Sequence, residues 1–192
     1  MSSTDTQQIP RVSFQGEAGA FSELAVRRAW PHGATAHPCE TFDEVLDLLI
    51  QGAVDFAMVP VENAIAGPVI KALSALDARS DSVRQVMDLR VPVHLFLLGV
   101  PGATLEGLRT VRSHPVALAQ CRFFMAQHPW LTPEGYYDTA GAARDVAAAQ
   151  DVTIGAVASE AAASKYQLSV LARNVEDVSA NWTRFVVVER RP

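Results

Sequence analysis

The sequence has few cysteines and no clustered histidines, and these two shortages argue against whole classes of site. Its two cysteines, Cys39 and Cys121, lie far apart and without paired spacing. The five histidines do not have the spacing of zinc ligands. A disulfide-stapled fold and a zinc site are therefore not indicated, and we expect both thiols to be free and buried.

The chain is also poor in charge and contains no long apolar run. Charged residues make up 19% of the sequence and the net charge is −5, so no basic surface for nucleic acid or an anionic membrane is predicted. The longest apolar run, 91–100, is too short to span a bilayer. Residues 1–10 are polar, lack the apolar core of a signal peptide, and are expected to form a disordered tail. A soluble, cytoplasmic protein is expected.

The sequence does contain a repeated passage from an apolar strand, through a short polar or glycine-bearing loop, into a helix. Such passages occur near residues 15–20, 62–69, 113–116, 138–140 and 158–161. This repetition is typical of α/β folds with parallel strands. We expect two lobes, one of about 11–85 plus 175–192 and the other of about 86–174, whose loops face one cleft.

Local signals define several elements within these units. Thr41 and Glu44 form a capping box that predicts a helix closing at Gly52. Residues 83–98 predict two linked strands, and the sequence from 116 to 127 predicts one continuous helix.

Polar residues stand beside two apolar strands, where open α/β sheets bind ligands. Glu62 and Asn63 lie at the carboxyl end of the buried strand 55–61. Thr183 precedes the β-branched run 186–188, so the last strand is expected to deliver its hydroxyl to a cleft built by earlier segments. The alternatives are an ordinary strand position for Thr183 and a hydrogen bond to a neighbouring loop for Glu62.

Together, these segments resemble the catalytic domain of prephenate dehydratases. The matching pieces share their order over residues 12–188 and are Gln15-Gly16, Gly19-Ala20-Phe21-Ser22, Val59-Pro60-Val61-Glu62-Asn63, Gly67, Ser113-His114-Pro115, Ala117-Leu118-Ala119-Gln120-Cys121, Thr139-Ala140, Ala142-Ala143, Ala158-Ser159, Ala162-Ala163, Tyr166, Asn174, Asp177, Asn181 and Thr183-Arg184-Phe185. The resemblance implies a two-lobed α/β fold of the periplasmic-binding-protein type (type 2), with the active site in the cleft between the lobes.

The same resemblance implies roles for particular residues. The catalytic set is Thr183, Glu62 and Asn63. The substrate-binding set is Ser113, Gln120, Thr139, Arg184, Ala20, Phe21 and Ser22. Arg184 either holds a substrate carboxylate or locks the two lobes together.

Two features depart from the family pattern. Ala64 and Pro68 stand where the family commonly has serine, and we interpret the hydroxyl missing beside Asn63 as a positioning group rather than a reacting one. Family members also commonly continue into a phenylalanine-binding regulatory domain. This sequence ends at Pro192, so either that control is absent or the sequence is a piece of a longer chain.

The implied activity is conversion of prephenate to phenylpyruvate, with loss of water and carbon dioxide, in phenylalanine biosynthesis. Aromatisation of the ring drives this reaction, so no metal, nucleotide or flavin is expected. Thr183 would donate a hydrogen bond to the departing hydroxyl, and Glu62 is the alternative proton source. Helix starts near Ala20, Val116 and Ala140 are expected to supply N–H groups for the substrate carboxylates.

Three other functions stay open. One is dehydration of arogenate, in which an amino group replaces the keto oxygen. Another is decarboxylation without aromatisation, which the intact Asn181 and Thr183-Arg184-Phe185 disfavour. The third is a non-catalytic module that binds or senses a small molecule, and the reason to consider it is Ala64 in place of the usual serine. A homodimer or higher homo-oligomer is expected, without a stretch that fixes its stoichiometry.

Overall fold

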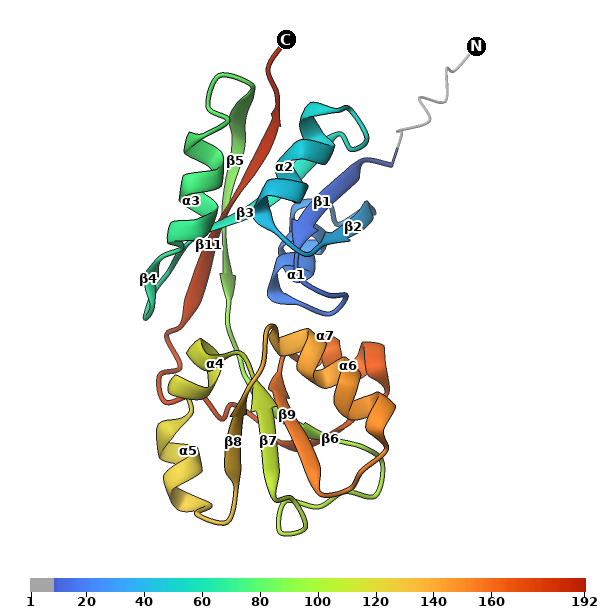
Figure 1. Cartoon of the computed structure of the whole chain (residues 1–192), viewed down its shortest axis with the longest axis vertical. Coiled ribbons are helices and arrows are strands. Elements are labelled where there is room, and N and C mark those ends of the chain that lie inside the picture. The colour runs from blue at the N-terminus through green and yellow to red at the C-terminus, as the bar shows by residue number, and fades with distance from the viewer. Residues whose placement is uncertain (1–8) are drawn as a thin grey trace.

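The computed structural model describes residues 9–192, so most of the predicted tail, 1–10, lies outside the described residues. The chain forms two lobes, each built around its own β-sheet (Figure 1). The predicted two-lobed α/β class is therefore confirmed. Between residues 9 and 192, none of the helices combines the length and hydropathy that crossing a bilayer requires.

The first lobe contains a mixed sheet in which the last strand of the chain lies between two earlier ones. The strand order is β2-β1-β3-β11-β5, and β4 pairs with β3. The strands are β1 (Arg11–Gln15), β2 (Thr35–Cys39), β3 (Phe56–Asn63), β4 (Gly67–Pro68), β5 (Val83–Pro92) and β11 (Trp182–Arg190). Strand β1 is parallel to β2 and β3, whereas β11 is antiparallel to both of its neighbours.

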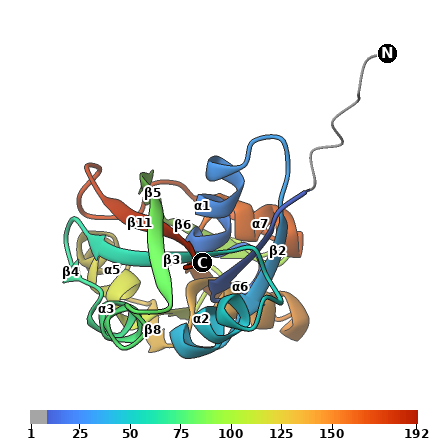
Figure 2. The same cartoon turned by 90° about the horizontal axis from the view of Figure 1, so that it is seen from above.

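Helices cover both faces of this sheet because its central strands are apolar on both sides. Helix α1 (Phe21–Ala29) lies on one face, and α2 (Phe42–Ile50) and α3 (Ile70–Asp77) lie on the other (Figure 2). Along β3, Met58 packs in the cluster beside α1, whereas Val59 packs in the cluster beside α2 and α3.

The predicted Thr41 cap is present at the start of α2, and the reciprocal bond of Glu44 goes to the residue before the N-cap instead of to the N-cap itself. The Glu44 N–H donates to Thr41 Oγ1 at 3.1 Å, and the Glu44 carboxylate accepts from the Glu40 N–H at 2.9 Å. Strand β2, which precedes this helix, is not predicted from sequence because it is a largely exposed edge strand that contains Pro38.

The second lobe contains a sheet of order β10-β6-β9-β7-β8. Its strands are β6 (Phe96–Gly99), β7 (Thr110–Ser113), β8 (Thr132–Gly135), β9 (Ile154–Ala158) and β10 (Ser169–Ala172), and its helices are α4 (Pro115–Ala119), α5 (Arg122–Gln127), α6 (Thr139–Ala149) and α7 (Glu160–Tyr166). Ala140, Ala142 and Ala143 of α6 are completely buried, and these small side chains let the helix pack closely on the sheet.

The single helix predicted over 116–127 is wrong: the segment forms α4 and α5, with a break at Gln120. The Asp177 N–H donates to the Gln120 carbonyl at 2.6 Å. The Asp177 carboxylate accepts from the N–H groups of Arg122 and Phe123 and so caps α5. A tertiary contact with a distant residue therefore starts a new helix within an apolar pattern that reads as continuous.

Two segments that run side by side connect the lobes. Residues 93–95 lead from β5 to β6, and residues 173–181 return to β11. They are joined by hydrogen bonds from the Val93 N–H to the Asn181 carbonyl, at 3.0 Å, and from the Val175 N–H to the Leu95 carbonyl, at 2.9 Å. The chain leaves the first lobe later than the boundary expected near residue 85, because β5 pairs with β11 as far as Pro92.

The loop between β1 and α1 also touches the second lobe. The Gly19 carbonyl accepts from Ser159 Oγ at 2.6 Å, and the Ala18 carbonyl accepts from Tyr166 Oη at 2.8 Å. Gly19 has φ +90°, and a Cβ there would lie 2.9 Å from the Cα of Ala162. Only glycine combines this backbone conformation with such a close approach of the lobes.

Candidate active site

Asn63 and Thr183 meet at the ends of paired strands. They are direct partners across β3 and β11, and Asn63 Nδ2 donates to Thr183 Oγ1 at 3.0 Å. The same amide nitrogen lies 3.0 Å from both Asn181 Oδ1 and the Trp182 carbonyl. One amide group therefore ties together three consecutive residues at the start of the last strand.

The amide oxygen of Asn63 is also fixed. It accepts from the backbone N–H groups of Ile65 and Ala66, at 3.1 and 2.9 Å, and Gln120 Nε2 lies 3.4 Å away. The orientation of the Asn63 amide is fixed, because its oxygen must face the two backbone N–H donors and its nitrogen must face the Trp182 carbonyl. The side-chain oxygen Oε1 of Gln120 in turn accepts from Asn181 Nδ2 at 3.0 Å, which joins the second lobe to the network.

A bulge in β3 decides which side chain faces Thr183. Arg184 pairs with Glu62 and Phe185 pairs with Pro60, so Val61 has no partner on β11. Partners in an antiparallel pair project to the same side, and neighbours along a strand to opposite sides. The extra residue reverses this alternation in β3 and turns Asn63 toward the α1 side of the sheet.

Glu62 and Arg184 consequently lie on the opposite face, with Asp88 of β5. Arg184 Nε is 3.8 Å from a carboxylate oxygen of each acid. Neither Glu62 nor Arg184 lines the cavity beside Asn63. The structure thus separates these two residues from the other members of the predicted site.

The cavity beside Asn63 has a volume of about 380 Å³ and lies between the lobes. Both lobes contribute to its lining, which is Phe21, Asn63, Ala66, Gly67, Pro68, Val69, Val93, Leu95, His114, Val116, Ala117, Gln120, Asp138, Thr139 and Thr183. Of the predicted site residues, Phe21, Asn63, Gln120, Thr139 and Thr183 are therefore brought together at one place.

The other three predicted residues are buried beside the cavity rather than in its lining. Ser113 is completely buried and donates to the Val157 carbonyl at 2.6 Å. Ala20 and Ser22 are 4% and 8% exposed at the start of α1. The Ser113 hydroxyl therefore has its hydrogen-bond partner within the core of the second lobe.

The N–H groups at the helix starts are already hydrogen-bonded. Ala20 donates to the Glu17 carbonyl at 3.0 Å, and Val116 donates to His114 Nδ1 at 3.2 Å. At α6, the Gly141 N–H donates to Asp138 Oδ1 at 2.8 Å. The expectation that the N–H groups of Ala20 and Val116 bind a ligand is not supported by this geometry, because each has a partner within the chain.

His114 and Asp138 are absent from the set predicted from sequence. Each directly precedes a helix and caps it with its side chain. Burial raises the pKa of Asp138 above its ordinary value. The signal that could have revealed both residues is their position, because each follows a strand and opens a helix at the edge where ligands bind.

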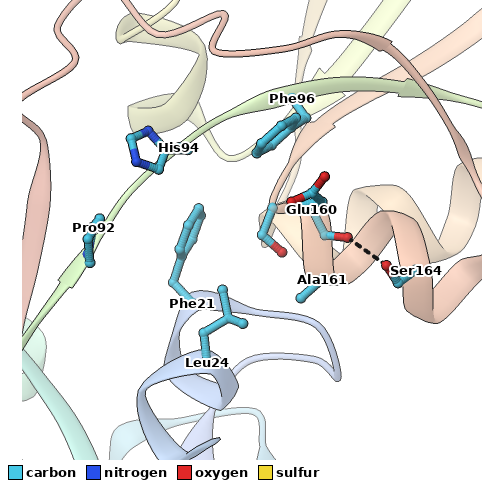
Figure 3. A pocket seen from close by; sticks show the side chains of 9 residues that line it. Phe21, Leu24, Pro92, His94, Phe96, Glu160, Ala161 and Ser164 are labelled. Carbon is cyan, nitrogen blue, oxygen red and sulfur yellow. Dashed lines mark hydrogen bonds between the residues drawn. The ribbon is translucent and has the colours of Figure 1, made fainter. Parts of the chain in front are cut away.

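Further hollows adjoin the candidate site. A wider one of about 1100 Å³ shares Val69, His114 and Asp138 with it, which gives the site a broad opening. Another, of about 440 Å³, lies where Phe21 of α1 extends toward the linking segment and α7 (Figure 3). Phe21 lines both this hollow and the candidate site. Within residues 9–192, no group of His, Cys, Asp and Glu side chains is arranged to hold a metal ion.

Comparison with known proteins gives one consistent family. The family model described as prephenate dehydratase matches residues 12–192. Arogenate dehydratase 2 of Petunia hybrida is 39% identical over 182 residues, which cover 95% of this chain and 45% of that protein. The bifunctional N-acyl-homoserine lactone acylase/prephenate dehydratase of Komagataeibacter europaeus is 40% identical over 184 residues, covering 94% of this chain and 63% of that protein.

A solved structure agrees with these relatives. The prephenate dehydratase of Arthrobacter aurescens, in complex with L-Phe, superposes with a TM-score of 0.87 at 29% identity, covering 95% of this chain and 61% of that one. The chain spans about half the length of the first curated relatives that it matches. Because the family model covers nearly all of the sequence, the chain belongs to the prephenate dehydratase family.

Proposed function

We propose that this chain is the catalytic unit of a lyase that converts prephenate to phenylpyruvate, with loss of water and carbon dioxide, in phenylalanine biosynthesis. The observation that carries the proposal is the bond network that fixes Asn63 against Thr183 at a cavity between the lobes. The family supplies the reaction class. The volume of about 380 Å³ falls in the range of small-molecule sites.

The proposed role of Thr183 follows from its hydrogen bond. Because Asn63 Nδ2 donates to Thr183 Oγ1, the hydroxyl keeps its own proton for another acceptor. In our proposal that acceptor is the hydroxyl leaving the substrate ring, where negative charge develops. An alcohol held in place by a rigid amide can stabilise this charge without reorganisation.

The substrate carboxylates require other donors. Among the described residues, no lysine or arginine lines the cavity. We propose that Thr139 and His114 donate hydrogen bonds to the carboxylates, and that Gln120, already bonded to Asn181, holds the two lobes in register. We give Glu62 and Arg184 no contact with substrate, because they lie on the other face of the strand pair.

The test replaces Thr183 by valine, which removes the donor and keeps the branched shape. We expect turnover of prephenate to fall about 10²- to 10³-fold with little change in melting temperature. Phenylpyruvate formation is followed by the absorbance of its enolate. Thr110→Val in β7, away from the cavity, is the matched control and should keep parental activity. A Thr183→Val variant as active as the parent would remove Thr183 from its proposed role.

Arogenate is the second candidate substrate. Relatives at 36–39% identity are named arogenate dehydratases, and the Asp138 carboxyl in the cavity could pair with an ammonium group. Comparison of kcat/KM for the two substrates decides between them. If prephenate raises the melting temperature but yields no product, a non-catalytic binding module is the better description.

Self-association is a separate proposal. Helix α3 carries Ile70 and Leu73 on its surface, 64% and 38% exposed, and this apolar face is the candidate contact between copies. Light scattering of the parent and of Ile70→Lys tests it, because a monomeric parent would exclude the contact.

A further inference from the structure

The cavity contains two side chains that can carry a transferable proton. Of the described residues that line it, Asp138 is the sole carboxyl and His114 the sole imidazole. Thr139 and Thr183 are alcohols, which donate hydrogen bonds but do not readily lose a proton near neutral pH. Under the proposed function, hydroxide leaves the ring, and a positioned acid accelerates such a step. The candidates for that acid are therefore Asp138 and His114.

One ring nitrogen of His114 already has a partner within the chain. Its Nδ1 accepts from the Val116 N–H at 3.2 Å. A nitrogen that accepts a hydrogen bond carries no proton, and an imidazolium, which carries a proton on each nitrogen, would lose this bond. His114 is thus suited to orienting a substrate through Nε2, and we assign the proton to Asp138.

The two oxygens of the Asp138 carboxyl differ in their surroundings, and Oδ2 lies beside the loop after β1, 3.2 Å from a Cβ built on Gly16. Its Oδ1 accepts from the Gly141 N–H at 2.8 Å, and among residues 9–192 no side chain donates to either oxygen. Burial raises the pKa of Asp138, and the nearby Glu17 raises it further. The N–H groups of Gly141 and Ala140 lower the pKa of Asp138, as would a positive charge on His114. The net effect is a pKa above the ordinary value for an aspartate.

The charges that face Asp138 come from several elements. Glu17 lies in the loop after β1 and is paired with Arg144 of α6 at 2.6 Å. Tyr137, next to Asp138 in the chain, donates to Glu17 at 3.1 Å. Burial raises the pKa of Tyr166 in α7, and Glu17 and Asp138 add to this rise. Among the described residues, no lysine or arginine pairs with the Asp138 carboxyl, so entry of a dianionic substrate would raise its pKa further.

We propose that Asp138 is the acid that protonates the hydroxyl leaving the substrate ring, an inference that rests on the proposed function. The Asp138 O–H bond breaks as its proton passes to the leaving oxygen. The carbon–oxygen bond breaks to release water, and the bond from the ring to its carboxylate breaks to release carbon dioxide. The electron pair of the latter bond enters the ring, which becomes aromatic. The Asp138 carboxylate then takes a proton from solvent, and no oxidant or reductant is needed.

The test uses Asp138→Asn, because asparagine is as good an N-cap as aspartate and cannot donate the proton. The matched control is Asp151→Asn. Asp151 also accepts from a backbone N–H two residues on, at 2.8 Å, but lies outside the cavity. Parent and variants are assayed with prephenate and with arogenate from pH 5 to 9, after subtraction of the rate in buffer alone. Melting temperatures verify that each variant is folded.

We expect Asp138→Asn to lower kcat for prephenate about 10²- to 10⁴-fold, with Asp151→Asn unchanged. The parental kcat should fall as pH rises through the pKa of Asp138 in the complex, and this fall should be missing in Asp138→Asn. A variant that keeps the parental kcat, or loses activity with the parental pH profile intact, overturns the inference and leaves the proposed function standing. A loss confined to KM for arogenate also overturns it, in favour of pairing with an ammonium group. A parent that forms no phenylpyruvate overturns both proposals.

Discussion

Replacement of Gly19 by alanine tests the contact between the lobes. Gly19 has φ +90°, and a side chain in the left-handed region costs about 1–2 kcal/mol. The added Cβ would also lie 2.9 Å from the Cα of Ala162, a backbone atom that cannot rotate away. Overpacking of this kind costs about a further 1–3 kcal/mol. We therefore expect Gly19→Ala to destabilise the protein by about 2–5 kcal/mol.

Gly33→Ala is the matched control. Gly33 has φ +115° and nothing within 4 Å of a built Cβ, so this variant carries the conformational cost alone. For a chain of this size, 1 kcal/mol shifts the melting temperature by about 2–4 °C. Scanning calorimetry of both variants should show the larger fall for Gly19→Ala. Equal falls would mean that the loop carrying Gly19 does not touch α7 in solution.

Three further predictions concern single side chains. Asn63→Asp should lower kcat about 10²- to 10³-fold, because a carboxylate cannot donate to Thr183; an effect on KM alone would contradict this. Burial raises the pKa of Cys121 to about 12, so a thiol reagent at pH 8 should modify it only in denaturant. Hydrogen bonds from Arg11 lower the pKa of Asp55 in the folded protein. The ionised Asp55 therefore stabilises the fold at pH values above the ordinary pKa of an aspartate, and this stabilisation is lost as the pH falls through the lowered pKa. Asp55→Asn should therefore reduce the melting temperature at pH 7 but not at pH 2, and an equal reduction at both would refute the reasoning.

The architecture could be predicted because it depends on local patterns. Apolar strands that end in polar loops before helices are visible in the sequence, as is the Thr41 capping box. What could not be predicted depends on distant residues. Asp177 divides the helix expected at 116–127, and β2 is held at a sheet edge although Pro38 argues against a strand.

The candidate site also contains some residues that could be predicted from local sequence and others that could not. Asn63 and Thr183 could be expected to meet, because both follow from motifs beside strand ends. Glu62 is adjacent to Asn63 in the chain, and nothing in the sequence marks the bulge that sends it to the other face. Asp138 and His114 are common cap residues, and their cavity positions become visible only when both lobes are assembled.

The bulge at Val61 makes the register of β3 part of the chemistry. If Val61 paired with Arg184 in a regular ladder, every later pair would move by one residue, and the Glu62 carboxylate, instead of the Asn63 amide, would lie opposite the Thr183 hydroxyl. A carboxylate would accept the proton that the hydroxyl is proposed to offer to the substrate, so a strand pair without the bulge would turn this donor away from the cavity. The spacing of backbone atoms, as much as the identity of any side chain, thereby selects which polar group the interlobe cleft receives.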